Sequence, residues 1–140
     1  MDTDKLKYKE LTNLVIKGFY EVYNELGGGF LESVYENAMT LVLQQQGLYV
    51  ETQKDITVYF RGALIGNFRA DMIVEGKILL ELKAVRCLES VHEAQLLNYL
   101  KATAIEVGLL MNFGNKPTFK RLIYNKQQQS EPQMNTDFTD

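Results

Sequence analysis

Hydrophobic positions in the first third of the chain recur with the period of an α-helix. Across residues 7–26 the apolar side chains are spaced three and four apart, which places them on one helical face: Leu11, Leu14, Val15, Phe19, Val22 and Leu26. Three consecutive glycines at 27–29 then interrupt the pattern, because glycine is unfavourable inside a helix and favours turns. A second apolar face predicts a second helix, with Gly47 as its C-terminal cap: Phe30, Leu31, Val34, Tyr35, Ala38, Leu41 and Val42.

After Gly47 the hydrophobic period changes to two, which predicts β-strands. Residues 56–60 alternate between apolar and polar, Arg61-Gly62 predicts a hairpin turn, and residues 63–74 form the returning strand. A second tight turn at residues 75–76 leads into residues 77–85, whose nearly continuous apolar run is typical of a central strand covered on both faces.

The remaining pattern predicts a helix over residues 89–102 and strands over 106–112 and 119–124, with Pro117 in the loop between the two strands. The order of elements indicates one α/β domain over residues 1–125, with a mixed central β-sheet flanked by helices. Residues 126–140 are polar and nearly free of aliphatic side chains, so we expect a disordered tail there.

Composition limits the classes of protein that the chain can represent. Its 140 residues, 46% of them hydrophobic, suffice for one compact domain. The net charge of -3 lacks the basic excess of a typical nucleic-acid-binding protein, although bound divalent cations would reverse the local sign around clustered carboxylates. A single cysteine, Cys87, excludes an intrachain disulfide and Cys-rich metal sites. With no secretory pattern and no apolar run of membrane-spanning length, we expect a cytoplasmic location and no membrane association.

Three charged residues stand out in the strand region. Glu81 and Lys83 are two positions apart and therefore point to the same face of a strand. The turn at residues 75–76 folds this strand back so that Asp71 comes close to opposite Glu81. Charges among apolar neighbours are unfavourable unless they are paired or bind a metal, so a shared metal ion is one interpretation. The alternative is an ordinary Glu-Lys pair on a solvent-facing strand.

The predicted helix over residues 89–102 carries a polar stripe. Gln95 and Tyr99 are four residues apart, and His92 lies three residues before Gln95 on the same side. The opposing apolar side holds Leu96, Leu97 and Leu100, so we expect the polar stripe to face a cleft or solvent. In the alternative interpretation Tyr99 packs in the core and Gln95 is solvated, and His92 either contacts phosphate or is structural.

The order Glu, Asp, E-x-K and helical Q-x-x-x-Y over residues 29–113 resembles the PD-(D/E)XK nuclease superfamily. Within it, G-F-L-E-S-V-Y from Gly29 to Tyr35 resembles the G-x-x-E-x-x-Y signature of a family of small bacterial proteins. No proline precedes Asp71, a departure that is frequent in the superfamily. The resemblance implies a restriction-endonuclease-like α/β core of the order αβββαβ.

The resemblance also implies a metal-dependent nuclease that hydrolyses phosphodiester bonds with a metal-activated water. Asp71 and Glu81, with the backbone carbonyl of Leu82, would coordinate Mg²⁺ or Mn²⁺, hard ions that prefer oxygen ligands. Glu32 would add a carboxylate, directly or through a water, and Lys83 would orient or deprotonate the attacking water.

The resemblance gives supporting roles to residues outside the central strands. Gln95 and Tyr99 would help to position the metal site and the nucleic-acid strand, and Tyr35 would pack behind Glu32. The expected partner is nucleic acid, DNA in preference to RNA, with a homo-oligomer or a larger partner protein delivering it. The competing hypothesis is a catalytically inactive domain of the same fold that binds nucleic acid, a nucleotide or a protein partner.

Overall fold

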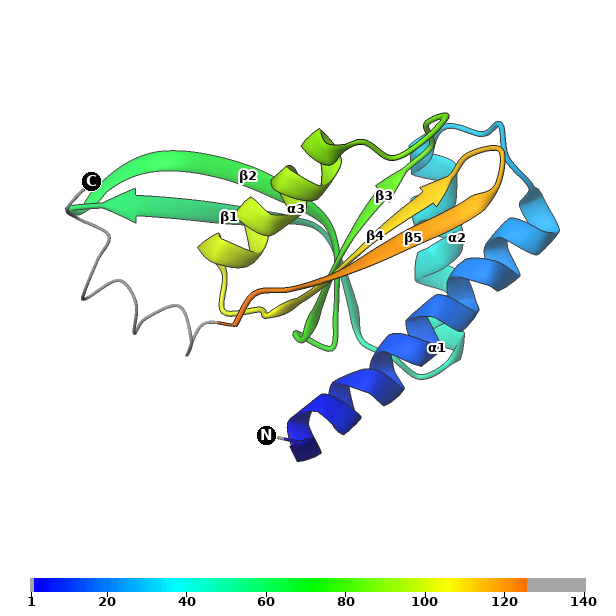
Figure 1. Cartoon of the computed structure of the whole chain (residues 1–140), viewed down its shortest axis with the longest axis horizontal. Coiled ribbons are helices and arrows are strands. Elements are labelled where there is room, and N and C mark those ends of the chain that lie inside the picture. Colours follow the sequence, from blue (N-terminus) through cyan, green and yellow to red (C-terminus); the bar gives the residue numbers. More distant parts are fainter. Residues whose placement is uncertain (1, 126–140) are drawn as a thin grey trace.

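The described part of the chain folds into a five-stranded mixed β-sheet with helices on both faces. The computed structural model describes residues 2–125, and side chains from residue 8 onward; the polar segment 126–140 lies outside the described residues. Helices α1 and α2 cover one face of the sheet and α3 covers the other (Figure 1). The elements are α1 (Asp2–Leu26), α2 (Glu32–Gln45), β1 (Val50–Phe60), β2 (Ala63–Val74), β3 (Ile78–Lys83), α3 (Ser90–Ala102), β4 (Val107–Phe113) and β5 (Pro117–Ile123).

The strands lie side by side in their sequence order. Strands β1, β2 and β3 form an antiparallel meander, β3 and β4 are parallel, and β5 returns antiparallel to β4. Both hairpin turns predicted from sequence are present: Arg61-Gly62 has φ values of 51° and 80°, and Glu75-Gly76 has 56° and 63°. Two successive positive φ values match type I′ geometry, which suits the right-handed twist of a hairpin. The first hairpin is closed by Phe60 and Ala63, with two residues between them, and the second by Val74 and Ile78, with three.

The core is divided by the sheet into two clusters. On one side, α1 and α2 pack against the even-numbered side chains of β3 and the odd-numbered side chains of β4; on the other, α3 packs against Leu79 and Leu110. Strands β3 and β4 are therefore buried on both faces, as the continuous apolar run of β3 predicts. Close packing on both faces constrains the central strands, so polar side chains on them are held in fixed positions.

The second helix begins later than its apolar pattern suggests. Phe30 and Leu31 precede α2 and are 47% and 77% exposed, and Leu41 within the helix is also exposed. The buried face is Tyr35, Met39 and Leu43. The prediction that Phe30, Leu31 and Leu41 belong to the buried face is wrong, because apolar residues occur on both sides of this segment and spacing alone cannot choose between them.

Two boundaries in the sheet also differ from the sequence pattern. Pro117 is the first residue of β5 rather than part of a loop. An edge strand tolerates proline at its first position, because no ladder hydrogen bond from its nitrogen is needed there. Strand β1 begins at Val50, six positions before the alternation at residue 56 becomes regular, and the polar residues between them conceal the extension.

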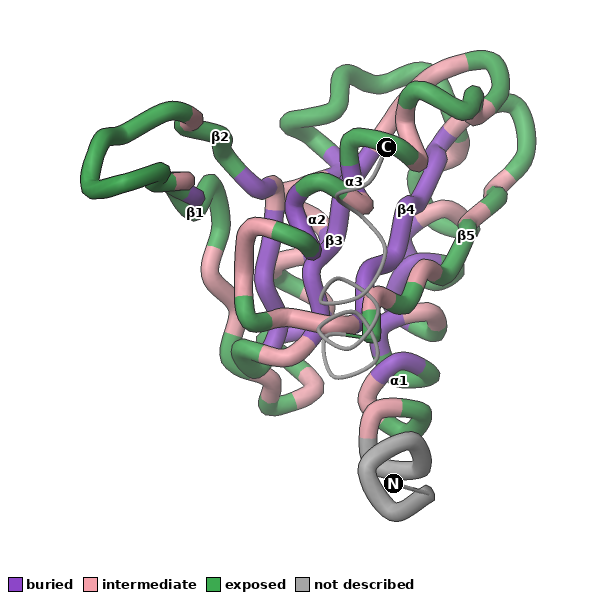
Figure 2. The backbone as a smooth tube through the Cα atoms, turned by 60° about the vertical axis from the view of Figure 1, so that its left-hand side comes forward, coloured by how far each residue is buried: buried purple, intermediate pink, exposed green. Residues whose placement is uncertain are grey.

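The hairpin of β1 and β2 extends far beyond the rest of the sheet. Strand β2 pairs with β3 only over Met72–Val74, whereas residues 63–70 pair with β1 alone. Figure 2 shows the resulting two-stranded ribbon projecting from the body of the molecule with mostly exposed residues. The strands β2 and β3 therefore separate beside Met72, and the first residue after this point is Asp71.

Candidate active site

Asp71 and Glu81 lie opposite each other where β2 separates from β3. The backbone pairing ends at Met72 and Leu80, one position before them. Each carboxylate then bonds to the opposite strand: the Asp71 N–H donates to Glu81 Oε2 (3.0 Å), and the Leu82 N–H donates to Asp71 Oδ2 (2.8 Å). The two side chains replace the ladder hydrogen bonds at this point, which holds both carboxylates in fixed positions.

Burial makes this pair of acids electrostatically unfavourable. Glu81 is 3% exposed. Desolvation, reinforced by the charge of Asp71, raises its pKa to about 8. The pKa of Asp71 is also raised, mainly by burial, although the Leu82 amide and the Lys83 charge act in the opposite direction. A cation bound between the two carboxyls would compensate the negative charge and favour the ionised form of both.

The donor atoms fit a hard divalent ion. Backbone hydrogen bonds use Asp71 Oδ2 and Glu81 Oε2, so each carboxylate keeps a second oxygen. Among residues 8–125, no group of three or more His, Cys, Asp or Glu side chains is placed to hold a metal ion. Mg²⁺ does not require such a group, because it is commonly bound by one or two carboxylates together with waters and substrate phosphates.

Glu32 approaches the pair from the first position of α2. Its Oε2 accepts a hydrogen bond of 3.4 Å from the Ala84 N–H, just beyond the end of β3. Its charge raises the pKa values of both Asp71 and Glu81, so the three carboxylates are electrostatic neighbours. Glu32 lies at the edge of the site and is exposed, whereas Asp71 is half-buried and Glu81 is buried.

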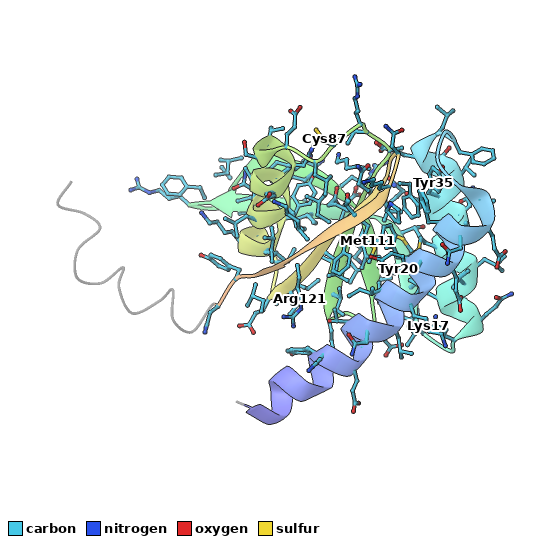
Figure 3. The ribbon with its side chains drawn as sticks, turned by 45° about the vertical axis from the view of Figure 1, so that its right-hand side comes forward. Lys17, Tyr20, Tyr35, Cys87, Met111 and Arg121 are labelled. Atoms are coloured by element: carbon cyan, nitrogen blue, oxygen red, sulfur yellow. The ribbon has the colours of Figure 1, made fainter. Side chains whose placement is uncertain are left out.

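Tyr35 fixes the turn from which Glu32 projects. Its side chain, labelled in Figure 3, is fully buried. Its ring stacks on Phe113, with 4.2 Å between ring centroids. The hydroxyl donates to the Gly27 carbonyl oxygen (2.6 Å) and accepts from the Phe30 N–H (3.2 Å). Tyr35 thus ties together the turn that leads into Glu32, and its support of the Glu32 side chain stays a prediction.

Lys83 ends β3, two positions after Glu81 on the same face. It is half-buried, and its charge lowers the pKa values of Asp71 and Glu81. In the part of the chain that the structure describes, it forms no ion pair with either acid. The ammonium group therefore lies within electrostatic reach of the site and is not held by a salt bridge.

Tyr99 is close to the site but lies in the core. It is 5% exposed and clusters with Leu96 and Leu100, so the prediction that its face opposes these leucines is wrong. Burial and then the charge of Glu81 raise the Tyr99 pKa, so the hydroxyl lies within electrostatic reach of that carboxylate. Gln95 is exposed, and its Nε2 donates to the Tyr99 hydroxyl (3.0 Å). The pair therefore reaches the same side of the sheet as Glu81.

His92 has a structural partner at the start of α3. Its Nδ1 accepts a hydrogen bond of 3.0 Å from the Glu89 N–H, as part of a reciprocal capping box. This bond satisfies a backbone donor that the helix itself leaves free. The phosphate contact suggested for His92 stays a prediction.

Gln53 is a site neighbour that the sequence does not reveal. It lies within β1 at φ 51°, a left-handed conformation that is unfavourable for a residue other than glycine, and the register of β1 with β2 skips it. Its Nε2 donates to Glu36 Oε1 (2.7 Å), and the same side chain lowers the pKa of the Asp71 carboxyl. The only signal in the sequence is the polar run between Val50 and Ile56, which does not identify the residue.

Replacing Gln53 with alanine should weaken the site without removing a charged group. Because groups that orient metal-binding carboxylates typically contribute 10- to 100-fold in metal affinity or activity, we expect a loss of about tenfold in both. The measurement is Mn²⁺ affinity and cleavage rate, with Gln45→Ala on the exposed side of α2 as the matched control. Equal values for the two variants would show that Gln53 does not position Asp71.

The raised pKa of Glu81 predicts a pH-dependent stability for the metal-free protein. The folded value is about 8 against 4.5 for the free side chain, so unfolding releases a proton across that interval. The Glu81 contribution to the free energy of unfolding is therefore present at low pH and falls by about 1.4 kcal/mol per pH unit as pH rises toward 8.

Glu81→Gln should remove this slope, because glutamine does not titrate. Denaturant unfolding in chelator at pH 5 to 8 should show the variant gaining stability relative to wild type as pH rises. A constant difference between the two proteins across this range would contradict the burial of an ionisable Glu81.

Known proteins share both the sequence pattern and the fold. The family model of the PD-(D/E)XK nuclease superfamily matches residues 9–122. The crystal structure of SSO0001 superimposes with a TM-score of 0.54 at 20% sequence identity, covering 70% of this chain and 52% of that chain. The chain thus spans about half the length of that structure, and the likeness concerns the fold alone. No curated protein matches the chain.

Proposed function

The chain belongs to the PD-(D/E)XK nuclease superfamily, and on this basis we propose that it is a metal-dependent nuclease that cleaves phosphodiester bonds in nucleic acid. The observation that carries the proposal is the buried pair of Asp71 and Glu81, held opposite each other by reciprocal bonds to backbone amides. We further infer membership of the G-x-x-E-x-x-Y family from Gly29, Glu32 and Tyr35, because Tyr35 supports the turn that carries Glu32.

Each charged residue has a distinct proposed role. Asp71 and Glu81, with the Leu82 carbonyl, hold Mg²⁺ or Mn²⁺, and Glu32 contributes directly or through a water. When bound, the ion would lower the pKa of the attacking water and stabilise charge on the phosphate. Lys83 orients or deprotonates that water and places a cation beside the charge that develops on the phosphate in the transition state.

Residues of α3 are proposed to orient the substrate strand. The Gln95 side chain is exposed and its amide holds the Tyr99 hydroxyl, so this pair can link the buried acids to a bound strand. The pKa of Tyr99 is raised, so its hydroxyl is protonated at neutral pH and can donate a hydrogen bond. His92 is proposed as a phosphate contact at the start of the same helix.

The proposed substrate is DNA in preference to RNA, in a cytoplasmic location. The net charge of -3 gives the chain little general attraction for a polyanion. A homo-oligomer or a larger partner protein is therefore proposed to deliver the substrate. No helix among the described residues has the length and apolar character needed to cross a bilayer.

One observation favours a second candidate function. No preformed group of three metal-binding side chains exists in residues 8–125. A catalytically inactive domain would have this property and could use the same surface to bind nucleic acid, a nucleotide or a protein partner. Such a domain would show no metal-dependent cleavage, and its affinity for its ligand would survive Glu81→Gln.

The test is a cleavage assay across substrate classes. Purified protein is incubated with end-labelled single- and double-stranded DNA and RNA in Mg²⁺, Mn²⁺ or chelator. The proposal expects cleavage of at least one substrate with metal and none with chelator. Absence of cleavage across all combinations supports the inactive domain instead.

A further inference from the structure

Three loops at one end of the sheet surround a cavity of about 430 Å³. Its walls come from residues 29–30 between α1 and α2, residues 84–86 after β3, and residues 113–115 at the β4–β5 turn. Figure 1 shows these three connections together at the same end of the molecule. The cavity lies beside Glu32, because Phe30 precedes that residue by two positions and the Ala84 N–H donates to its carboxylate.

Buried side chains hold two of these loops together. Asn112 is 1% exposed and bonds the backbone of Val85 twice, accepting from its N–H and donating to its carbonyl oxygen, both at 2.9 Å. A Cβ atom at Gly114 would collide with that same carbonyl oxygen, so the approach of the two loops requires glycine. The Tyr23 hydroxyl bonds the carbonyl oxygens of Gly114 (2.9 Å) and Asn115 (2.7 Å).

The third loop is held by Tyr35, which bonds Gly27 and the Phe30 N–H as described above. All three walls are thus fixed by side chains that do not themselves enter the cavity. Loops pinned in this way lose little conformational entropy when a ligand binds, so the cavity has the character of a preformed site.

The lining identifies the chemistry of a ligand. Arg86 is exposed at the cavity and forms no ion pair within the described residues, and no acidic side chain lines the walls. A guanidinium group binds phosphate through paired N–H donors. Phe30 is 47% exposed at the same cavity, and an exposed aromatic ring can stack against a nucleobase. The cavity volume lies within the range of small-molecule sites.

We propose that this cavity holds one nucleotide of the substrate strand next to the bond to be cleaved, with a phosphate on Arg86 and a base against Phe30. The inference rests on the proposed nuclease function for the identity of its ligand, and adds to it a site outside the carboxylate group. It makes Arg86 and Phe30 determinants of strand binding rather than catalytic residues.

The test measures binding of a short fluorescent single-stranded DNA in chelator, so that its result does not depend on cleavage. Arg86→Gln should raise the dissociation constant about tenfold, and Phe30→Leu should raise it severalfold. The matched control is Arg121→Gln, which removes the same charge from the exposed strand β5 (Figure 3). Thermal melting of each variant checks that the fold is intact.

Equal losses for Arg86→Gln and Arg121→Gln would overturn the proposal, because they would indicate only diffuse attraction to phosphate. An effect of Arg86→Gln without one of Phe30→Leu would overturn the base contact. Failure of the nuclease function has a different signature: wild type would cleave nothing with any metal, whatever the binding results.

Discussion

Glu81→Gln is expected to reduce cleavage by more than about 100-fold while leaving the fold intact. Even residues that only orient metal ligands contribute 10- to 100-fold, and a carboxylate ligand contributes more. Glutamine keeps the shape of glutamate, and its carbonyl oxygen can still accept the hydrogen bond from the Asp71 N–H. The variant therefore removes the charge of one ligand without opening the junction of β2 and β3.

The measurement is the initial cleavage rate under saturating metal, with Asp71→Asn expected to behave in the same way. Glu21→Gln on the exposed side of α1 removes an equal charge away from the site and should leave the rate unchanged. Wild-type activity in both site variants would remove Asp71 and Glu81 from the mechanism.

Lys83→Ala is expected to lower the cleavage rate by about 100- to 1,000-fold and to leave metal affinity nearly unchanged. Proton transfer by a positioned side chain and electrostatic stabilisation of a transition state have effects of this size. Lysine carries no oxygen that could serve as a ligand, so its loss should appear in kcat rather than in metal binding. The ratio of the two effects distinguishes Lys83 from the acids.

Single-turnover cleavage and Mn²⁺ binding are measured on the same protein sample. Lys17→Ala, an exposed lysine of α1 (Figure 3), is the matched control for loss of one positive charge. A Lys83→Ala protein that cleaves at the wild-type rate would assign the residue a structural role at the end of β3.

The hydrophobic pattern predicts the fold well where burial is one-sided or complete. The continuous apolar run of β3 indicates a strand covered on both faces, and the glycine turns fix which residues face each other across the β2–β3 hairpin. Counting outward from a two-residue Glu75-Gly76 turn brings Asp71 to within one position of Glu81; the exact facing pair depends on Lys77, which also lies in the turn, so that Val74 pairs with Ile78.

The pattern fails where apolar residues occupy both sides of a helix or where a side chain is amphipathic. Leu41 and Tyr99 illustrate these two cases: Leu41 lies exposed within α2, and Tyr99 is buried although its hydroxyl lies within electrostatic reach of Glu81. Gln53 could not be found at all, because its role depends on the register of β1 with β2, in which the flanking pairs Thr52–Met72 and Lys54–Ala70 set it across from Asp71. Such long-range geometry has no local sequence signal.

The central claim is that Asp71 and Glu81 form a metal site. Isothermal titration calorimetry of Mn²⁺ binding to metal-free wild type and to Glu81→Gln tests it without any assumption about the substrate. A metal site formed by Asp71 and Glu81 predicts saturable binding to wild type and an affinity at least about tenfold weaker in the variant, because one charged oxygen ligand has been neutralised. Equal Mn²⁺ affinity in the two proteins, or no binding to wild type, would contradict the assignment of these carboxylates as the metal centre of a nuclease.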